Sequence, residues 1–123
     1  EIADEDVVVN TPTNYGNSYP VGQCTWGVKE LAPWASNWWG NANTWAIYAS
    51  AQGYRVGDVP VVGAIAVWDG GEYGHVAYVT DVQSENSIQV LEANYRRQKQ
   101  IANYRGFFNP HEFLGKVTYI YPN

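Results

Sequence analysis

Apolar residues recur at helical spacing in the first half of the chain. Cys24, Val28 and Leu31 fall at positions i, i+4 and i+7, and so lie on one face of a predicted helix that begins at Cys24. Pro33 marks the predicted end, because proline cannot continue a helix. Residues 34–43 are interpreted as a loop.

A second short helix is predicted from an N-cap at Thr44 to a stop at Gly53. Beyond it the apolar period changes to two, which is typical of strands. The predicted strands cover residues 64–69, 75–82, 87–95 and 113–122, with 103–108 as a further candidate. Short connections favour antiparallel neighbours. Helices followed by a run of strands predict an α+β fold, with N-terminal helices packed on an antiparallel β-sheet.

The length and composition suit one domain. The chain has 123 residues, of which 46% are hydrophobic, enough for a packed core. Residues 1–18 combine clustered acids with turn formers and are interpreted as a linker and an N-terminal arm. Residues 19–123 form the predicted domain, which we expect to be monomeric and part of a longer chain.

The charge pattern argues against two classes of partner. The net charge is −5, and seven basic residues scattered along the chain make no stripe that could follow phosphates, so nucleic acid is not expected. No apolar run approaches the roughly 20 residues of a membrane span, so no membrane insertion is expected.

Cys24 is the single cysteine of the chain. An internal disulfide is therefore excluded, and two interpretations remain: an inert buried thiol or a reactive one. A thiol at the start of a helix favours the second, because the helix N-terminus stabilises a thiolate.

His75 opens a predicted strand that also places Ala77, Val79 and Asp81 on its face. On the next strand Glu92 and Asn94 share a face with Ile88 and Val90. If the turn between the strands has an even number of residues, His75, Glu92 and Asn94 lie on the same side of the sheet. A four-residue turn at 82–85 would set His75 opposite Glu92; a two-residue turn at 85–86 would leave them about four residues apart.

A helix-start cysteine, a strand-start histidine and a carboxylate on its face satisfy the requirements for a nucleophile, a base and a group that orients the base. Glu92 is the favoured partner of His75, because a carboxylate stabilises the imidazolium whereas the Asn94 amide can only orient it. The Cys24 backbone N–H is a candidate oxyanion donor, with the Gln23 and Asn94 side chains as weaker ones.

Three stretches together resemble the CHAP family, the cysteine/histidine-dependent amidohydrolases and peptidases. They are GQCTWGVKELAPW, VGAIAVWDGGEYGHVAYVTDV and IQVLEANY, and the resemblance extends from about Tyr19 to Tyr121. It implies a papain-like fold, and it implies the catalytic residues Cys24, His75, Glu92 and Asn94.

The resemblance also implies a secreted or cell-wall hydrolase of peptidoglycan that cleaves the muramoyl–L-alanine amide or a peptide bond of the stem or cross-bridge. No cofactor is expected. Some relatives carry an acidic calcium loop shortly before the cysteine, but TPTNYGNSYPVGQ has no carboxylate. Two histidines and one cysteine provide no zinc cluster.

Two alternatives remain open. The aromatic segment WASNWW could belong to a glycan-binding module in which Cys24 is inert, or the fold could carry a small-molecule amidase or transamidase. For the hydrolase, we expect a substrate groove beside Cys24 lined by Tyr73 and at least one of Trp34, Trp38 and Trp39.

Overall fold

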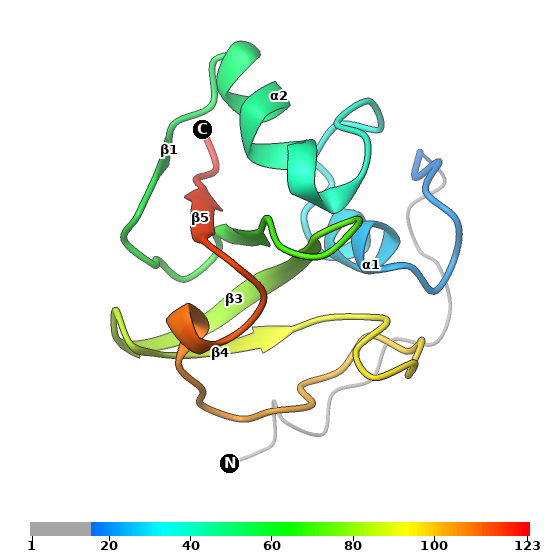
Figure 1. Cartoon of the computed structure of the whole chain (residues 1–123). Coiled ribbons are helices and arrows are strands. Elements are labelled where there is room, and N and C mark those ends of the chain that lie inside the picture. Colours follow the sequence, from blue (N-terminus) through cyan, green and yellow to red (C-terminus); the bar gives the residue numbers. More distant parts are fainter. Residues whose placement is uncertain (1–15) are drawn as a thin grey trace.

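The computed structural model describes residues 16–123. Two helices are followed by an antiparallel sheet of five strands, which confirms the predicted α+β fold (Figure 1). The helices and strands are α1 Cys24–Leu31, α2 Trp45–Ala51, β1 Val56–Gly57, β2 Ile65–Trp68, β3 His75–Ser84, β4 Ser87–Leu91 and β5 Val117–Ile120. Short 3₁₀ turns, η2 Ala42–Thr44 and η3 Pro110–Glu112, precede α2 and β5.

The strand order is β1-β5-β2-β3-β4, and every neighbouring pair is antiparallel. The C-terminal strand therefore lies inside the sheet, between β1 and β2. The two strands that matter for the site, β3 and β4, are joined by a tight hairpin at one edge.

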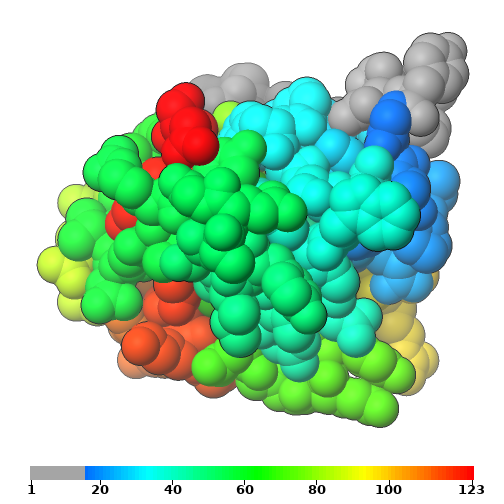
Figure 2. All heavy atoms as spheres, turned by 90° about the horizontal axis from the view of Figure 1, so that it is seen from above, coloured from blue at the N-terminus to red at the C-terminus, as the bar shows by residue number. Residues whose placement is uncertain are grey.

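Two apolar clusters cover the two faces of the sheet. The helix-side core joins α1 and α2 to the sheet through Val28, Trp39, Trp45, Ile65, Val67, Val76 and Ile120, among others. The outer core lies on the opposite face and contains Trp68, Ala77, Val79, Ile88, Val90, Val117 and Tyr119, with Phe108 and Phe113 packed against it. Seen from above, α2 and the loops around it form the surface over the helix-side core (Figure 2).

The predicted domain boundary falls within a segment that contacts the domain. Asn17 donates to the Trp26 carbonyl and to the Glu30 carboxylate, both at 2.9 Å. Asn17 is therefore tied to α1, while Gly16 and Ser18 bond Asn37 in the following loop, although the sequence pattern places all three in the arm. The rest of the predicted arm, residues 1–15, lies outside the described residues.

Several predicted strand boundaries are wrong. The predicted strand 87–95 ends at Leu91, and 113–122 shrinks to 117–120, because residues 113–115 turn to bond the Gly70 backbone. The candidate strand 103–108 contributes one isolated bridge, from Phe108 to Ile88. Strand β1 was not predicted, because two residues carry no readable alternation.

The second helix starts where it was predicted, but Thr44 does not cap it as expected. Its hydroxyl, with one hydrogen to donate, lies 2.7 Å from the Trp39 carbonyl and 2.9 Å from the Asn41 carbonyl, and it accepts no helix N–H. Thr44 therefore fastens the preceding loop to the helix.

Strands β3 and β4 are joined by the two-residue turn at 85–86, since Ser84 pairs with Ser87. A regular ladder from this turn would keep His75 and Glu92 on one face but leave them too far apart for contact.

Two register shifts shorten the distance between His75 and Glu92. Strand β3 has one extra residue on either side of the pair Asp81 and Val82. Each extra residue reverses the face that the following side chains take, so two together restore the alternation and slide the pairing by two residues. Between the shifts the faces are exchanged, so Val82 rather than Asp81 packs on the outer core. The net result brings Glu92 onto a diagonal with His75.

Within residues 16–123, no helix is long and apolar enough to cross a membrane.

Candidate active site

Cys24 is the first residue of α1, and its thiol is free and partly exposed. Gln23 occupies the N-cap position without a side-chain cap, and the first backbone N–H groups of the helix have no intrahelical acceptor. Gly27 lets the helix approach the sheet closely, because a Cβ there would lie 2.8 Å from the Cβ of Ala93. The thiol is thus fixed at a helix N-terminus, where a negative charge is favoured.

His75 is held at the start of β3 by a glycine that no other residue could replace without strain. Gly74 has φ +74°, and a Cβ there would lie 2.6 Å from both the Asn43 nitrogen and the Trp68 carbonyl oxygen. The Asn43 N–H also donates to the Tyr73 carbonyl at 2.9 Å, which fastens the loop before His75 to η2.

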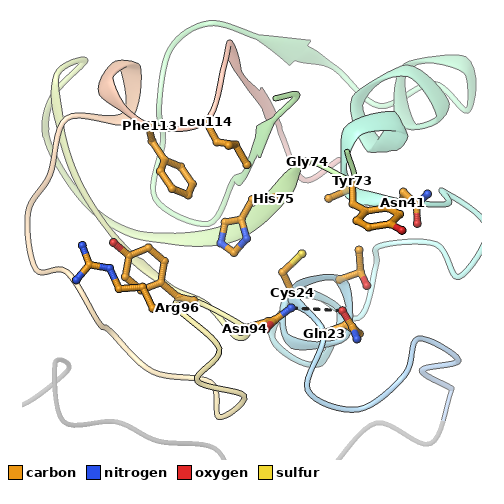
Figure 3. A pocket seen from close by; sticks show the side chains of 13 residues that line it. Gln23, Cys24, Asn41, Tyr73, Gly74, His75, Asn94, Arg96, Phe113 and Leu114 are labelled. Carbon is orange, nitrogen blue, oxygen red and sulfur yellow. Dashed lines mark hydrogen bonds between the residues drawn. The ribbon is translucent and has the colours of Figure 1, made fainter. Parts of the chain in front are cut away.

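The His75 ring lies between Cys24 and Glu92. Its Nε2 is 2.8 Å from Glu92 Oε1, and Figure 3 shows the Cys24 thiol beside the ring, in the cleft. Nδ1 is thereby the ring nitrogen available to the thiol. Burial opposes the charged imidazolium, but hydrogen bonds and charges from Cys24 and Glu92 outweigh it and raise the pKa of His75 to about 9.

Glu92 is completely buried and has a second partner that the sequence did not reveal. Arg105 donates from Nε to Oε2 at 2.9 Å and from Nη2 to Oε1 at 2.6 Å. Burial raises the pKa of the Glu92 carboxyl, but Arg105 and His75 outweigh this effect and hold the pKa below its usual value. The carboxylate is therefore ionised while it bonds the histidine. The carboxylate supports the ring from inside the protein, where it is closed off from solvent.

Asn94 lies beside Cys24 but does not bond the histidine. The residue is past the end of β4 in the left-handed region, with φ 58°. Its Nδ2 donates to Gln23 Oε1 at 3.4 Å, and its Oδ1 accepts from Lys99 Nζ at 2.9 Å. Asn94 therefore contacts Gln23, next to the nucleophile candidate, and Glu92 is the side chain that bonds the ring.

A cleft of about 670 Å³ passes over these residues. Figure 3 shows Cys24 and His75 at its centre. Its lining comprises Gln23, Cys24, Thr25, Asn41, Ala42, Tyr73, Gly74, His75, Asn94, Tyr95, Arg96, Phe113 and Leu114.

Tyr73 lines the cleft and is 59% exposed. The prediction for the tryptophans is wrong. Trp39 is fully buried in the helix-side core, and Trp34 stacks on Tyr54 at 5.5 Å against the same core. Trp38 is 83% exposed but lies outside the cleft lining. The aromatic wall opposite Tyr73 is built by Tyr95 and Phe113, which the sequence pattern did not single out.

Within the described part of the chain, no three His, Cys, Asp or Glu side chains gather as metal ligands would. The chemistry that the cleft offers is that of a thiol, an imidazole and a carboxylate in series.

The sequence of the chain is similar to those of known proteins. The sequence matches the CHAP domain over residues 14–94. It is 59% identical over 109 residues to a Streptococcus mutans protein described as a hydrolase, covering 87% of this chain and 52% of that protein. It is 44% identical over 96 residues to N-acetylmuramoyl-L-alanine amidase sle1 of Staphylococcus haemolyticus, covering 75% of this chain and 29% of the amidase.

A solved structure has the same fold. The crystal structure of an N-acetylmuramoyl-L-alanine amidase from Staphylococcus aureus superposes with a TM-score of 0.77 at 28% sequence identity, over 92% of this chain and 34% of that one. The chain thus spans about half of its streptococcal relative and about a third of the staphylococcal amidases. Since the family match covers most of the sequence and includes the helix-start cysteine and the strand-start histidine, the chain belongs to the CHAP family.

Proposed function

We propose that this domain hydrolyses peptidoglycan at the muramoyl–L-alanine amide, outside the cell or in the cell wall, with Cys24 as nucleophile. The observation that carries the proposal is that Cys24 and His75 lie together in the cleft, with buried Glu92 bonded to the histidine at 2.8 Å. The Cys24 thiol lies at a helix N-terminus, next to a histidine whose pKa is raised to about 9, and this is the arrangement that activates a nucleophilic thiol.

The hydrolysis reaction follows from this arrangement of Cys24 and His75. The Cys24 sulfur attacks the carbonyl carbon of the scissile amide, and the carbonyl oxygen becomes an oxyanion. His75 then donates its Nδ1 proton to the leaving amine, the C–N bond breaks, and a thioester remains on Cys24. Neutral His75 next takes a proton from water, which attacks the thioester and releases the carboxylic acid and the thiol. Glu92 stabilises the imidazolium through Nε2 in both halves.

Two donors are suitably placed for the oxyanion. The backbone N–H of Cys24 is free of an intrahelical acceptor, and the Gln23 side chain lines the cleft beside it. Because Gln23 Oε1 accepts from Asn94, the amide NH₂ of Gln23 is left to face the substrate. Asn94 in this scheme acts through Gln23, by fixing its orientation.

The walls of the cleft suit a glycopeptide. Tyr73 on one side and Tyr95 and Phe113 on the other offer aromatic surface for sugar rings and peptide. Arg96 brings a positive charge to the same cleft, in a chain of net charge −5. Stem peptides carry carboxylates, which a guanidinium binds well.

The relatives favour the amidase bond over a bond within the peptide. Several matched proteins and the superposed solved structure carry the name N-acetylmuramoyl-L-alanine amidase. The cleft gives no support to the glycan-binding alternative, which relied on the tryptophans of WASNWW. Trp34 and Trp39 pack in the core, and Trp38 lies outside the cleft lining.

Digestion of purified peptidoglycan tests the proposal. The fragments are analysed by mass spectrometry, with new amines labelled. We expect a new free amine on L-alanine. A new amine elsewhere in the stem or cross-bridge would make the domain an endopeptidase, and no new amine at all would contradict a hydrolase.

A further inference from the structure

Arg105 is a cation buried inside a box of aromatic rings. Its side chain is only 8% exposed. The guanidinium carbon lies 4.0 Å from the ring centre of Phe108, 4.1 Å from that of Phe113, 4.3 Å from that of Tyr95 and 5.4 Å from that of Trp68. Rings on several sides hold the planar guanidinium in one orientation.

The edge of this guanidinium is directed at Glu92. Nε bonds one carboxylate oxygen and Nη2 bonds the other, at 2.9 and 2.6 Å, so both oxygens are fixed by one rigid fork. Oε1 also bonds His75 Nε2 at 2.8 Å. Arg105 and His75 therefore share one carboxylate oxygen, and a rotation of the carboxylate would break three contacts at once.

Stability alone is a poor explanation for this arrangement. Taking a carboxylate and a guanidinium out of water costs several kcal/mol per ion, and apolar residues of similar size often replace such pairs without loss of stability. The aromatic box could enclose an apolar side chain equally well. What an apolar side chain could not do is hold the Glu92 carboxylate ionised and aimed at the histidine.

We propose that Arg105 is a positioning residue of the catalytic centre, acting through Glu92. Its fork fixes Oε1 on His75 Nε2. Its charge makes Glu92 a poor proton acceptor, so that the imidazolium proton goes to the leaving amine at Nδ1 and not to the carboxylate at Nε2. The effect on turnover rests on the proposed function; the effect on the thiol does not.

Two consequences separate this role from a structural one. Arg105 is not among the residues that line the cleft, so its loss should lower kcat and leave KM nearly unchanged. The guanidinium supplies part of what holds the pKa of Glu92 down, so its loss should raise that pKa. Glu92 would then support the imidazolium less at low pH, and the acid limb of the pH profile should move to higher pH.

The test compares Arg105→Gln and Arg105→Lys with Arg55→Gln. Arg55 is a matched control, because its guanidinium also stacks on a ring, 5.6 Å from the Tyr121 centre, but on a remote part of the sheet. The measurements are kcat and KM on peptidoglycan and the rate of Cys24 alkylation by iodoacetamide between about pH 4 and 9.

For Arg105→Gln we expect kcat to fall roughly 10- to 100-fold, as for other residues that orient a catalytic group, and the acid limb of alkylation to rise by roughly one pH unit. Arg105→Lys should restore the limb, because the charge returns, but only part of kcat, because an ammonium cannot form the fork. Arg55→Gln should change neither.

An unshifted alkylation profile in folded Arg105→Gln would overturn the proposal. Alkylation needs no peptidoglycan, so a shifted profile in a protein that cleaves nothing would refute the proposed function while supporting the role of Arg105. If Arg105→Gln does not fold, NMR of the unchanged protein decides: the Arg105 Nε–H signal should exchange slowly and move as the Cys24–His75 pair titrates. A signal that does not move with this titration overturns the proposal.

Discussion

Glu92 Oε1 lies 2.8 Å from His75 Nε2, which leaves Nδ1 of the ring for the Cys24 thiol. This contact fixes which ring nitrogen serves the reaction and stabilises the charged form of the histidine. It comes from residues on β3 and just beyond β4 that a regular hairpin would hold apart.

Replacing Glu92 by Gln should lower the pKa of His75 from its raised value of about 9. The imidazolium would then be lost at lower pH, so the alkaline limb of the pH–rate profile moves down. Without the Glu92 charge, the imidazolium is also less stable and supports a negative Cys24 sulfur less. The acid limb of the pH–rate profile should therefore move to higher pH, and the pH range of activity should narrow. We expect folding stability to fall by about 3–5 kcal/mol, because Arg105 loses its carboxylate.

Asp81→Asn is the control for that variant. Asp81 is a carboxylate on the same strand pair, bonded to Gln89 at 3.2 Å, and removing its charge should leave both limbs in place. Equal profiles for Glu92→Gln and the wild type would contradict the role given to Glu92.

The stability of the protein should itself depend on pH. The pKa of His75 is raised from 6.5 to about 9 on folding, so its contribution is fully present below about pH 6.5 and is lost as the pH rises through about 9. A shift of that size corresponds to about 3 kcal/mol. The pKa of Glu92 is lowered, so its contribution is present above about pH 4.5 and is lost as the pH falls.

Urea denaturation between about pH 4 and 10 measures this dependence. Cys24→Ala should flatten part of the alkaline loss, because the thiol contributes to the raised pKa of His75. Stability that increases between pH 6.5 and 9 would be inconsistent with the ion pair.

Arg96 should act in substrate binding. Its guanidinium lies over the Tyr95 ring, 5.4 Å from the ring centre, at the end of the cleft away from Cys24 (Figure 3). Losing one charged hydrogen bond should raise KM for peptidoglycan roughly 10-fold in Arg96→Gln and leave kcat unchanged. Arg97→Gln removes the same charge from the same turn, but Arg97 does not line the cleft, so KM should not change. Equal effects from both variants would indicate general attraction and not a contact.

Gly74→Ala should disturb His75. A Cβ there would collide with the backbone of Asn43 and Trp68, whereas Gly53 has a comparable φ of +95° and nothing within 4 Å. Gly53→Ala therefore measures the strain of the positive φ alone, about 1 kcal/mol. Gly74→Ala should cost more, by about 1–3 kcal/mol, and should slow Cys24 alkylation. Thermal unfolding together with alkylation checks both, and identical results would show that the close approach has no consequence.

The sequence was sufficient to identify the residues that open regular elements. Cys24 and His75 stand out because helical spacing and strand alternation begin at them. An even number of residues in the hairpin turn places Glu92 on the same face of the sheet as His75. The distance between the two side chains, however, depends on two extra residues in β3. A register shift leaves no mark in an alternating pattern, so the sequence was compatible with the contact without establishing it.

Arg105 was missed for a different reason. It lies in the connection between β4 and β5, where no apolar period exists, and its partner Glu92 is brought to it by tertiary packing. Trp34 and Trp39 show the converse error, since they were predicted to line the groove but pack in the core. Amino-acid composition does not distinguish an aromatic residue that lines a cleft from one that packs in a core. A buried carboxylate in the apolar stretch VLEANY was the one available signal that a cation must be found elsewhere in the chain.

The measurement that tests the central claim most directly compares the wild type with Cys24→Ala on purified peptidoglycan, at equal concentration and after both are shown to unfold at similar temperatures. Released amines are followed with time near pH 7. We predict steady release by the wild type and none above background by Cys24→Ala, because no thioester can form. Release by Cys24→Ala at a rate near that of the wild type would contradict a nucleophilic role for the thiol.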